Sequence, residues 1–167
     1  MSYINDNLLP NEKVHFRAKV SAAVFLRAIL SFVIGIFFFI LALEPAQQVE
    51  ESVSIISGLQ FIAAILFFGI AIFIGVRALI YFLTTEFAVT NRRVIAKRGF
   101  IQRSTIEILL QQVESVIVHQ NILGRIIKFG TVVVIGTGGT KEPFRAISGP
   151  VKTRRIINEI LEHYSNA

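Results

Sequence analysis

The chain has 167 residues, of which 53% are hydrophobic and only 17% are charged. Soluble domains average about 25% charged residues, so this deficit places part of the chain in lipid. The sequence has no cysteine, which excludes disulfides, thiolate metal sites and cysteine nucleophiles. The net charge is +6, and residues 77–167 carry 13 of the 17 Lys and Arg against six acids.

The N-terminal segment, residues 1–20, contains one strand-like stretch. Polar and apolar residues alternate from Glu12 to Val20, and a period of two is typical of a β-strand with one buried face. A strand here can cover the open edge of a sheet on the same side of the membrane. We therefore expect it to pair with the sheet of the C-terminal domain.

A first membrane span is predicted over residues 21–43. Its uncharged core, Ala28–Leu43, has 16 residues, which span only roughly 24 Å as a helix. Val20–Leu26 lengthens the run, but Arg27 interrupts it. An arginine near a helix end can extend its guanidinium to the headgroups, so we place Arg27 at the cytoplasmic interface. The alternative is that Arg27 faces a partner or a pore within the membrane.

A second span is predicted over residues 53–80, so that residues 21–83 form a transmembrane hairpin. Residues 52–76 are 25 consecutive residues without a charge, or roughly 37 Å of helix against a hydrocarbon core of about 30 Å. Arg77 and Tyr81 follow as interface anchors. The connection, residues 44–52, carries three Glu and no Lys or Arg.

Flanking charge predicts the topology. Lys and Arg stay on the cytoplasmic side, and both ends of the hairpin are basic while its connection is acidic. We therefore expect a multi-pass protein of the inner (cytoplasmic) membrane with both termini cytoplasmic. The apolar run begins too far from Met1 for a cleaved signal peptide.

Residues 84–167 form a β-rich domain with one helix. Short runs of alternating or β-branched residues are separated by turn residues, and Gly138-Gly139 is typical of a hairpin. The predicted strands are Thr84–Thr90, Arg93–Arg98, Ser104–Leu110, Glu114–Gln120, Thr131–Thr137 and Lys141–Ile147. They favour a barrel or sandwich. Residues 150–164 have one apolar face at helical spacing, which indicates a helix that plugs the barrel or, alternatively, lies on the membrane.

The order of motifs in this domain resembles a known family. TNRRVIAKRG at 90–99 is followed by Leu123-Gly124-Arg125, Gly130-Thr131-Val132 and Gly136-Thr137-Gly138-Gly139. Residues 84–164 are similar to the bacterial pleckstrin-homology-like (PH-like) domain of small two-helix membrane proteins. The resemblance implies an α+β membrane protein, in which a PH-like antiparallel β-barrel of about seven strands is capped by the C-terminal helix. It implies no catalytic residue set.

No motif in the chain favours catalysis. The glycines at 136–139 precede another predicted strand, whereas a nucleotide-binding loop needs a helix there. His15, His119 and His163 fall in three separate elements, without the spacing of a metal site. We therefore expect no catalytic residue, no metal, no cofactor and no enzymatic activity.

A basic cluster is the main candidate site. Anionic cytoplasmic lipids attract such charges by about 1 kcal/mol each, although the same charges could serve only to orient the spans. No recognition element for nucleic acid accompanies them. The headgroup candidates are Arg92, Arg93, Lys97, Arg98 and Arg103.

A second candidate is the loop Leu123-Gly124-Arg125, interpreted as a protein contact with a special backbone angle at Gly124. Together these features favour a membrane-anchored binding or scaffold module, which recognises anionic lipid headgroups, a membrane-protein partner or a second copy. The rival is a structural or regulatory subunit of a homo- or hetero-oligomeric complex. A channel is disfavoured because Gln60 and Ser57 are the polar residues deep in the second span.

Overall fold

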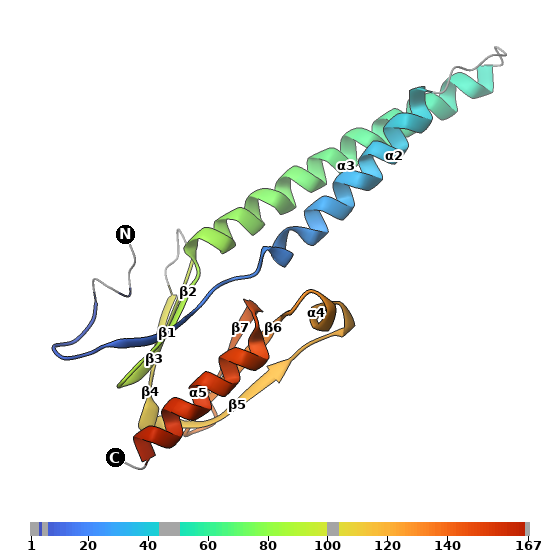
Figure 1. Ribbon diagram of the computed structural model, residues 1–167. Coiled ribbons are helices and arrows are strands. Elements are labelled where there is room, and N and C mark those ends of the chain that lie inside the picture. The colour runs from blue at the N-terminus through green and yellow to red at the C-terminus, as the bar shows by residue number, and fades with distance from the viewer. Residues whose placement is uncertain (1–3, 5–6, 44–50, 100–103, 166–167) are drawn as a thin grey trace. The chain divides into compact units, whose positions relative to one another are not determined.

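The computed structural model describes residue 4 and residues 7–43, 51–99 and 104–165. The chain separates into two compact units. Residues 24–79 form a helical unit that contains α2 (Leu26–Leu43) and most of α3 (Glu51–Thr84). Residues 1–23 and 80–167 form a second unit, here termed the domain, which holds all the described strands (Figure 1).

Most of the exposed side chains on the two long helices are apolar. The segments Ala22–Leu43 and Ile55–Thr84 have 22 and 30 residues. In the most apolar stretch of each segment, only 6% and 11% of the residues, respectively, are buried. A core helix of a soluble protein would be mostly buried, so these helices are long and apolar enough to cross a membrane. The first differs from the prediction because Ala22–Phe25 is a 3-10 turn, η1, ahead of α2.

Aromatic rings join α2 to α3. Phe38 stacks on Phe67 with ring centroids 5.7 Å apart, and Gly35 lies where a Cβ would come within 3.0 Å of the Phe68 ring. Gly35 is buried on an otherwise largely exposed helix. A small residue at this point therefore allows close packing of the two helices.

The domain has two antiparallel sheets. The first has the order β1 (Val14–Ala18), β2 (Glu86–Thr90), β3 (Arg93–Arg98) and β4 (Ser104–Leu109). The second has the order β5 (Val113–His119), β6 (Phe129–Gly136) and β7 (Lys141–Ser148). The strand predicted from the alternation of residues 12–20 is present as β1, and it pairs with β2 from Val14 opposite Thr90 to Ala18 opposite Phe87.

The sheets do not close into a barrel. β4 leads into β5 through a 3-10 turn, η2 (Leu110–Gln112), and these two strands do not pair among the described residues. On the other side, the residues after β1 pair with β7 through a bridge between Val20 and Ile147, next to hydrogen bonds from the Ser21 amide to Ala146 and from the Ser148 amide to Lys19. The predicted antiparallel PH-like arrangement with a capping helix is confirmed, whereas closure is absent because η2 turns the chain away before β5 begins.

The core lies between the sheets and α5 (Pro150–Ser165). Phe87 and Phe144 meet from the two sheets with ring centroids 4.5 Å apart, and Ile157 brings the buried face of α5 against them. The helix begins after Gly149, whose φ of 61° would strain any residue with a Cβ.

Candidate membrane-binding surface

The chain segments before α2 and at the end of α3 attach to the same strand of the domain. The Ser21 amide donates to the Ala146 carbonyl (2.7 Å). The Tyr81 hydroxyl, in the last turn of α3, donates to the Arg145 carbonyl (3.0 Å). We term this part of the domain the hairpin end: residues 19–23, residues 80–85 and the adjoining half of β7.

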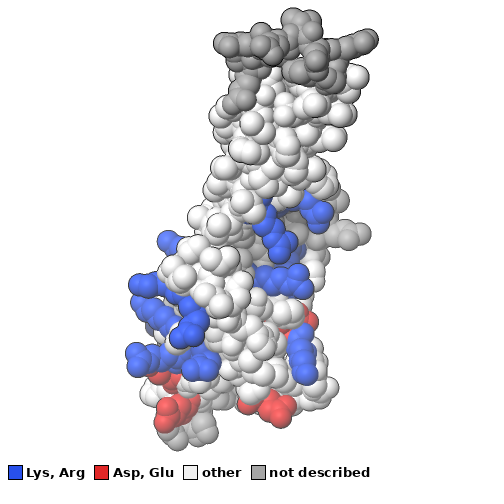
Figure 2. All heavy atoms as spheres, turned by 90° about the vertical axis from the view of Figure 1, so that its right-hand side faces the viewer, with Lys and Arg blue, Asp and Glu red and all other residues white. Residues whose placement is uncertain are grey.

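Three cations lie at the hairpin end. Lys19 and Arg145 are exposed, and Arg98, at the end of β3, reaches β7. Its guanidinium donates to the Pro143 carbonyl and stacks 5.0 Å above the centre of the Phe144 ring. Stacking and hydrogen bonding hold Arg98 in place. Figure 2 shows Lys and Arg side chains over much of one face of the domain.

A groove of about 320 Å³ opens at the hairpin end. It combines the cations Arg17 and Lys19 with the exposed ring of Phe82 and one carboxylate, Glu86. Its remaining lining is Ile4, Ala18, Val20, Thr85 and Phe87. Cations next to an apolar wall suit an anionic group that carries a hydrocarbon chain.

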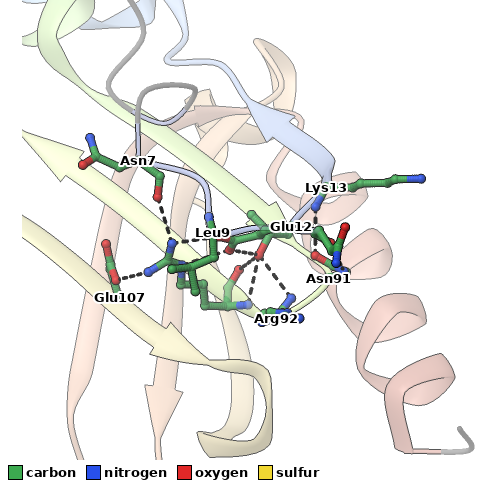
Figure 3. Close-up of polar contacts among 10 residues, drawn as sticks. Asn7, Leu9, Glu12, Lys13, Asn91, Arg92 and Glu107 are labelled. Atoms are coloured by element: carbon green, nitrogen blue, oxygen red, sulfur yellow. Dashed lines mark hydrogen bonds and ion pairs between the residues drawn. The ribbon is translucent and has the colours of Figure 1, made fainter.

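Arg93 lies in a different environment, inside an ion-pair network with Glu12 and Glu107, which are both labelled in Figure 3. Its Nε and Nη2 donate to the two carboxylate oxygens of Glu12 at 2.9 and 2.8 Å, and Nη1 donates to Glu107 at 2.5 Å. Nη2 also donates to the Asn7 carbonyl, and the Thr90 hydroxyl donates to Glu12 at 2.7 Å. The guanidinium of Arg93 is therefore shared among partners within the domain.

The network shifts the pKa of the Glu12 carboxyl. Burial alone would raise it, but hydrogen bonds from Arg93, the Leu9 amide and Thr90, with the charge of Arg93, outweigh burial and lower the pKa to about 2. The same hydrogen bonding to Glu12 raises the pKa of Arg93. Both groups are thus charged at neutral pH and stabilise β1 against β2 and β3.

Comparison with known proteins identifies a family with this architecture. A family model described as bacterial PH domain matches residues 21–161, which include both apolar helices and most of the domain. The chain belongs to the bacterial PH domain family. No curated protein and no solved structure matches the chain. The resemblance of the C-terminal motifs is therefore confirmed at the level of the family.

In this bacterial PH domain the predicted basic cluster does not form one patch. Arg92 is exposed at the turn between β2 and β3, while Lys97 and Arg98 end β3. At about 3.3 Å per residue, β3 separates the two groups by roughly 17 Å. Arg93 is only 9% exposed and belongs to the network described above. Arg103 lies outside the described residues.

The predicted interface anchors of the bacterial PH domain lie on the two helices. Arg27 is exposed in the first turn of α2, and Arg77 is exposed on α3 with its guanidinium 5.7 Å from the centre of the Phe73 ring. Tyr81 is half-buried because its hydroxyl is bound to β7. Tyr81 therefore holds the last turn of α3 to β7 within the domain.

Leu123, Gly124 and Arg125 lie on α4 (Ile122–Ile126), between β5 and β6. The prediction of a special backbone angle at Gly124 is wrong, because its φ is not positive. Glycine is needed there for space: a Cβ would lie 2.5 Å from the Phe129 carbonyl oxygen and 2.7 Å from Oδ1 of Asn121. Positive φ occurs instead at Gly138 and Gly139, in the predicted hairpin turn between β6 and β7.

Reasoning from the sequence missed Lys19 and Arg145 as site residues. They are far apart in the chain, and both belong to the hairpin end only because the residues after β1 pair with β7. The alternation around Lys19 signalled a strand, but no local pattern gave its partner. Among the residues that the structure describes, no group of His, Asp and Glu is placed to hold a metal ion.

Proposed function

We propose that this protein is a membrane-anchored binding module whose hairpin end recognises anionic lipid headgroups. The observation that carries the proposal is the position of Lys19, Arg98 and Arg145 next to the segments that continue into the two apolar helices. Headgroup phosphates lie at that level when the helices cross a bilayer. PH-like domains are in general binding modules, and the family assignment agrees with a binding role.

Sheet pairing supports the topology that the proposal needs. β1 precedes the first helix, β2 follows the second, and the two strands are hydrogen-bonded neighbours. Paired strands cannot lie on opposite sides of a bilayer, so this pairing supports a topology in which both flanks are on one side and the helices cross the membrane an even number of times. The excess of Lys and Arg on those flanks favours the cytoplasmic side. Reporter tags at Ala167 and near Gln47 should then lie in opposite compartments, and tags in the same compartment would contradict this topology.

The recognition chemistry is that of a phosphodiester. The fork of N–H donors on Arg145 can bind two phosphate oxygens, and the Lys19 ammonium adds a compact charge. Arg98 contributes a fixed positive charge beside them because β7 holds its guanidinium. Phe82 offers the adjoining apolar surface for the first part of an acyl chain.

The full chain is the material for the test. A fragment of residues 84–167 would lack Glu12 and leave Arg93 without its main partner, which is strongly destabilising for a buried pair. The chain is purified in mild detergent with equal amounts of phosphatidylglycerol and phosphatidylcholine. Native mass spectrometry then reports the lipids that each protein retains.

The double variant Lys19→Gln/Arg145→Gln should lose preference for the anionic lipid by about 30-fold, from about 1 kcal/mol per charge. The matched control is Arg154→Gln/Arg155→Gln, which removes the same charge from exposed positions on α5. Equal preference in the wild type and the first variant would overturn the proposal. The same spectra report the number of chains in each complex and any proteins that co-purify. A complex with a fixed number of chains and no retained lipid would favour the rival role as a structural subunit.

A further inference from the structure

The α4 loop, residues 121–128, presents large apolar side chains to solvent. Ile122 is 79% exposed, Leu123 57%, Ile126 71% and Ile127 44%. Side chains of this size are normally buried, and a contiguous exposed group marks an interaction site. Gly124 alone of this helix is buried, so the loop turns its small residue inward and its large residues outward.

Hydrogen bonds hold the loop in this conformation. The Asn121 side chain accepts from the Gly124 amide (2.7 Å) and caps the helix. The Gln120 side chain donates to the carbonyls of Gly124 (3.1 Å) and Phe129 (3.0 Å). Because a Cβ at position 124 would collide with Phe129, glycine at this position allows α4 to pack closely against the start of β6. The exposure of the apolar side chains is therefore a consequence of the conformation of the loop.

Cations border the apolar group. Arg125, Lys128 and Lys152 line a groove of about 280 Å³ together with Gln120, Gly149, Pro150 and Val151. Residues 115–141 contain no Asp or Glu, and neither do residues 143–158. Apolar side chains bordered by Lys and Arg match a bilayer with anionic headgroups, where the apolar groups enter the acyl boundary and the cations meet phosphates.

The loop adjoins the hairpin end of the domain. The Gly149 amide donates to the Lys128 carbonyl (2.8 Å), and the preceding Ser148 amide donates to the Lys19 carbonyl (2.9 Å). Two successive hydrogen bonds thus connect the α4 loop to the residue that precedes the first apolar segment. Figure 1 shows α4 beyond the strand ends, at the junction of β5 and β6.

We propose that the α4 loop inserts into the lipid leaflet that the helices enter and so docks the domain on an anionic membrane surface. This inference rests on the proposed function, since it needs the hairpin end to face the bilayer. The occupant is lipid, because the charged residues that line the bordering groove are all cations and the loop adjoins the end of the domain that continues into the apolar helices.

The chain has no cysteine, so single nitroxide spin labels report position without further changes. Labels are placed at Ile122→Cys and Ile126→Cys in the full chain, reconstituted in nanodiscs of phosphatidylglycerol and phosphatidylcholine. The control is Glu162→Cys on α5. It lies near Tyr164, which Gln111 binds at the far end of β5 (2.7 Å), away from the α4 loop. Collision with oxygen and with a water-soluble nickel chelate is measured for each label.

Labels at 122 and 126 should collide with oxygen and be shielded from nickel, whereas the label at 162 should collide freely with nickel. Removing the cations by Arg125→Gln/Lys128→Gln/Lys152→Gln should shift both loop labels toward nickel exposure in anionic discs. Free nickel access at 122 in the unchanged background would overturn insertion and leave a protein partner as the occupant. Shielding from both reagents would also overturn it, since a second copy would then cover the loop. The lipid retention of the Lys19 and Arg145 variant is read separately, so headgroup binding and insertion can fail independently.

Discussion

Replacing Glu12 by Gln should destabilise the domain by about 3 kcal/mol at neutral pH. The fold lowers the pKa of Glu12 from 4.5 to about 2, and each pKa unit corresponds to about 1.4 kcal/mol. The Glu12 side chain is fully buried and that of Arg93 is 11% exposed, so solvent screens the pair little. The magnitude agrees with the roughly 3–5 kcal/mol lost when one partner of a buried pair is removed.

The pH dependence follows from the direction of the shift. A carboxyl whose pKa is lower in the folded state stabilises the fold above its unfolded pKa, here 4.5, and loses this contribution as pH falls toward 2. At pH 3 more than half of the gap between wild type and Glu12→Gln should be lost, because the unfolded carboxyl is then protonated while the folded one is still mostly charged.

The assay is urea unfolding of the full chain in nanodiscs, followed by circular dichroism at pH 7 and at pH 3. Helices in lipid keep their backbone hydrogen bonds, so the change in signal reports the domain. The control is Glu159→Gln, whose carboxylate lies 4.0 Å from Arg155 with both side chains largely exposed, and whose loss should leave the midpoint unchanged. A Glu12→Gln midpoint equal to that of Glu159→Gln at pH 7, or a gap that stays as wide at pH 3, would refute the reasoning.

Two further predictions concern packing. Thr90→Val should cost about 1–3 kcal/mol in the same urea assay, because it removes a buried hydroxyl that donates to Glu12 and accepts from two backbone amides, whereas Thr90→Ser should stay close to wild type. Gly35→Leu should separate α2 from α3, since even a Cβ there lies 3.0 Å from the Phe68 ring, while Gly69→Leu enters open space. Distances between spin labels on the two helices should increase only for Gly35→Leu; an equal increase for both would count against close packing at Gly35.

Much of the fold could be predicted because its signals are local. The 25 uncharged residues from 52 to 76 fix a helix once lipid is the solvent, and period-two alternation finds β1 without any knowledge of its partner. The turn glycines at 138 and 139 have the positive φ that their hairpin requires. Each of these features depends on neighbouring residues, so a single sequence contains the information.

The candidate site was harder to predict because charge does not reveal burial. Arg92 and Arg93 are adjacent in the chain, yet Arg92 is exposed and Arg93 is paired with Glu12. In the sequence, both helices lie between Glu12 and Arg93. Lys19 and Arg145 belong to the same end of the domain only because residues 19–21 pair with residues 146–148 across the two sheets. β7 is irregular at that point: its register with β6 shifts between Gly130 and Val132. No alternation pattern could give the register there.

The route of the chain ties the stability of the domain to the helices. β1 and β2 are paired neighbours, and the connection between them is the whole two-helix hairpin. The domain can complete its first sheet, and neutralise Arg93 with Glu12, only when both flanks of the hairpin are on the same side of the membrane. A chain with one helix inserted and the other excluded would separate β1 from β2, expose the edge of β2 and leave Arg93 buried without its main carboxylate. If the two helices cross a membrane, a chain inserted with its flanks on opposite sides would therefore lack both the β1–β2 pairing and the Glu12–Arg93 ion pair.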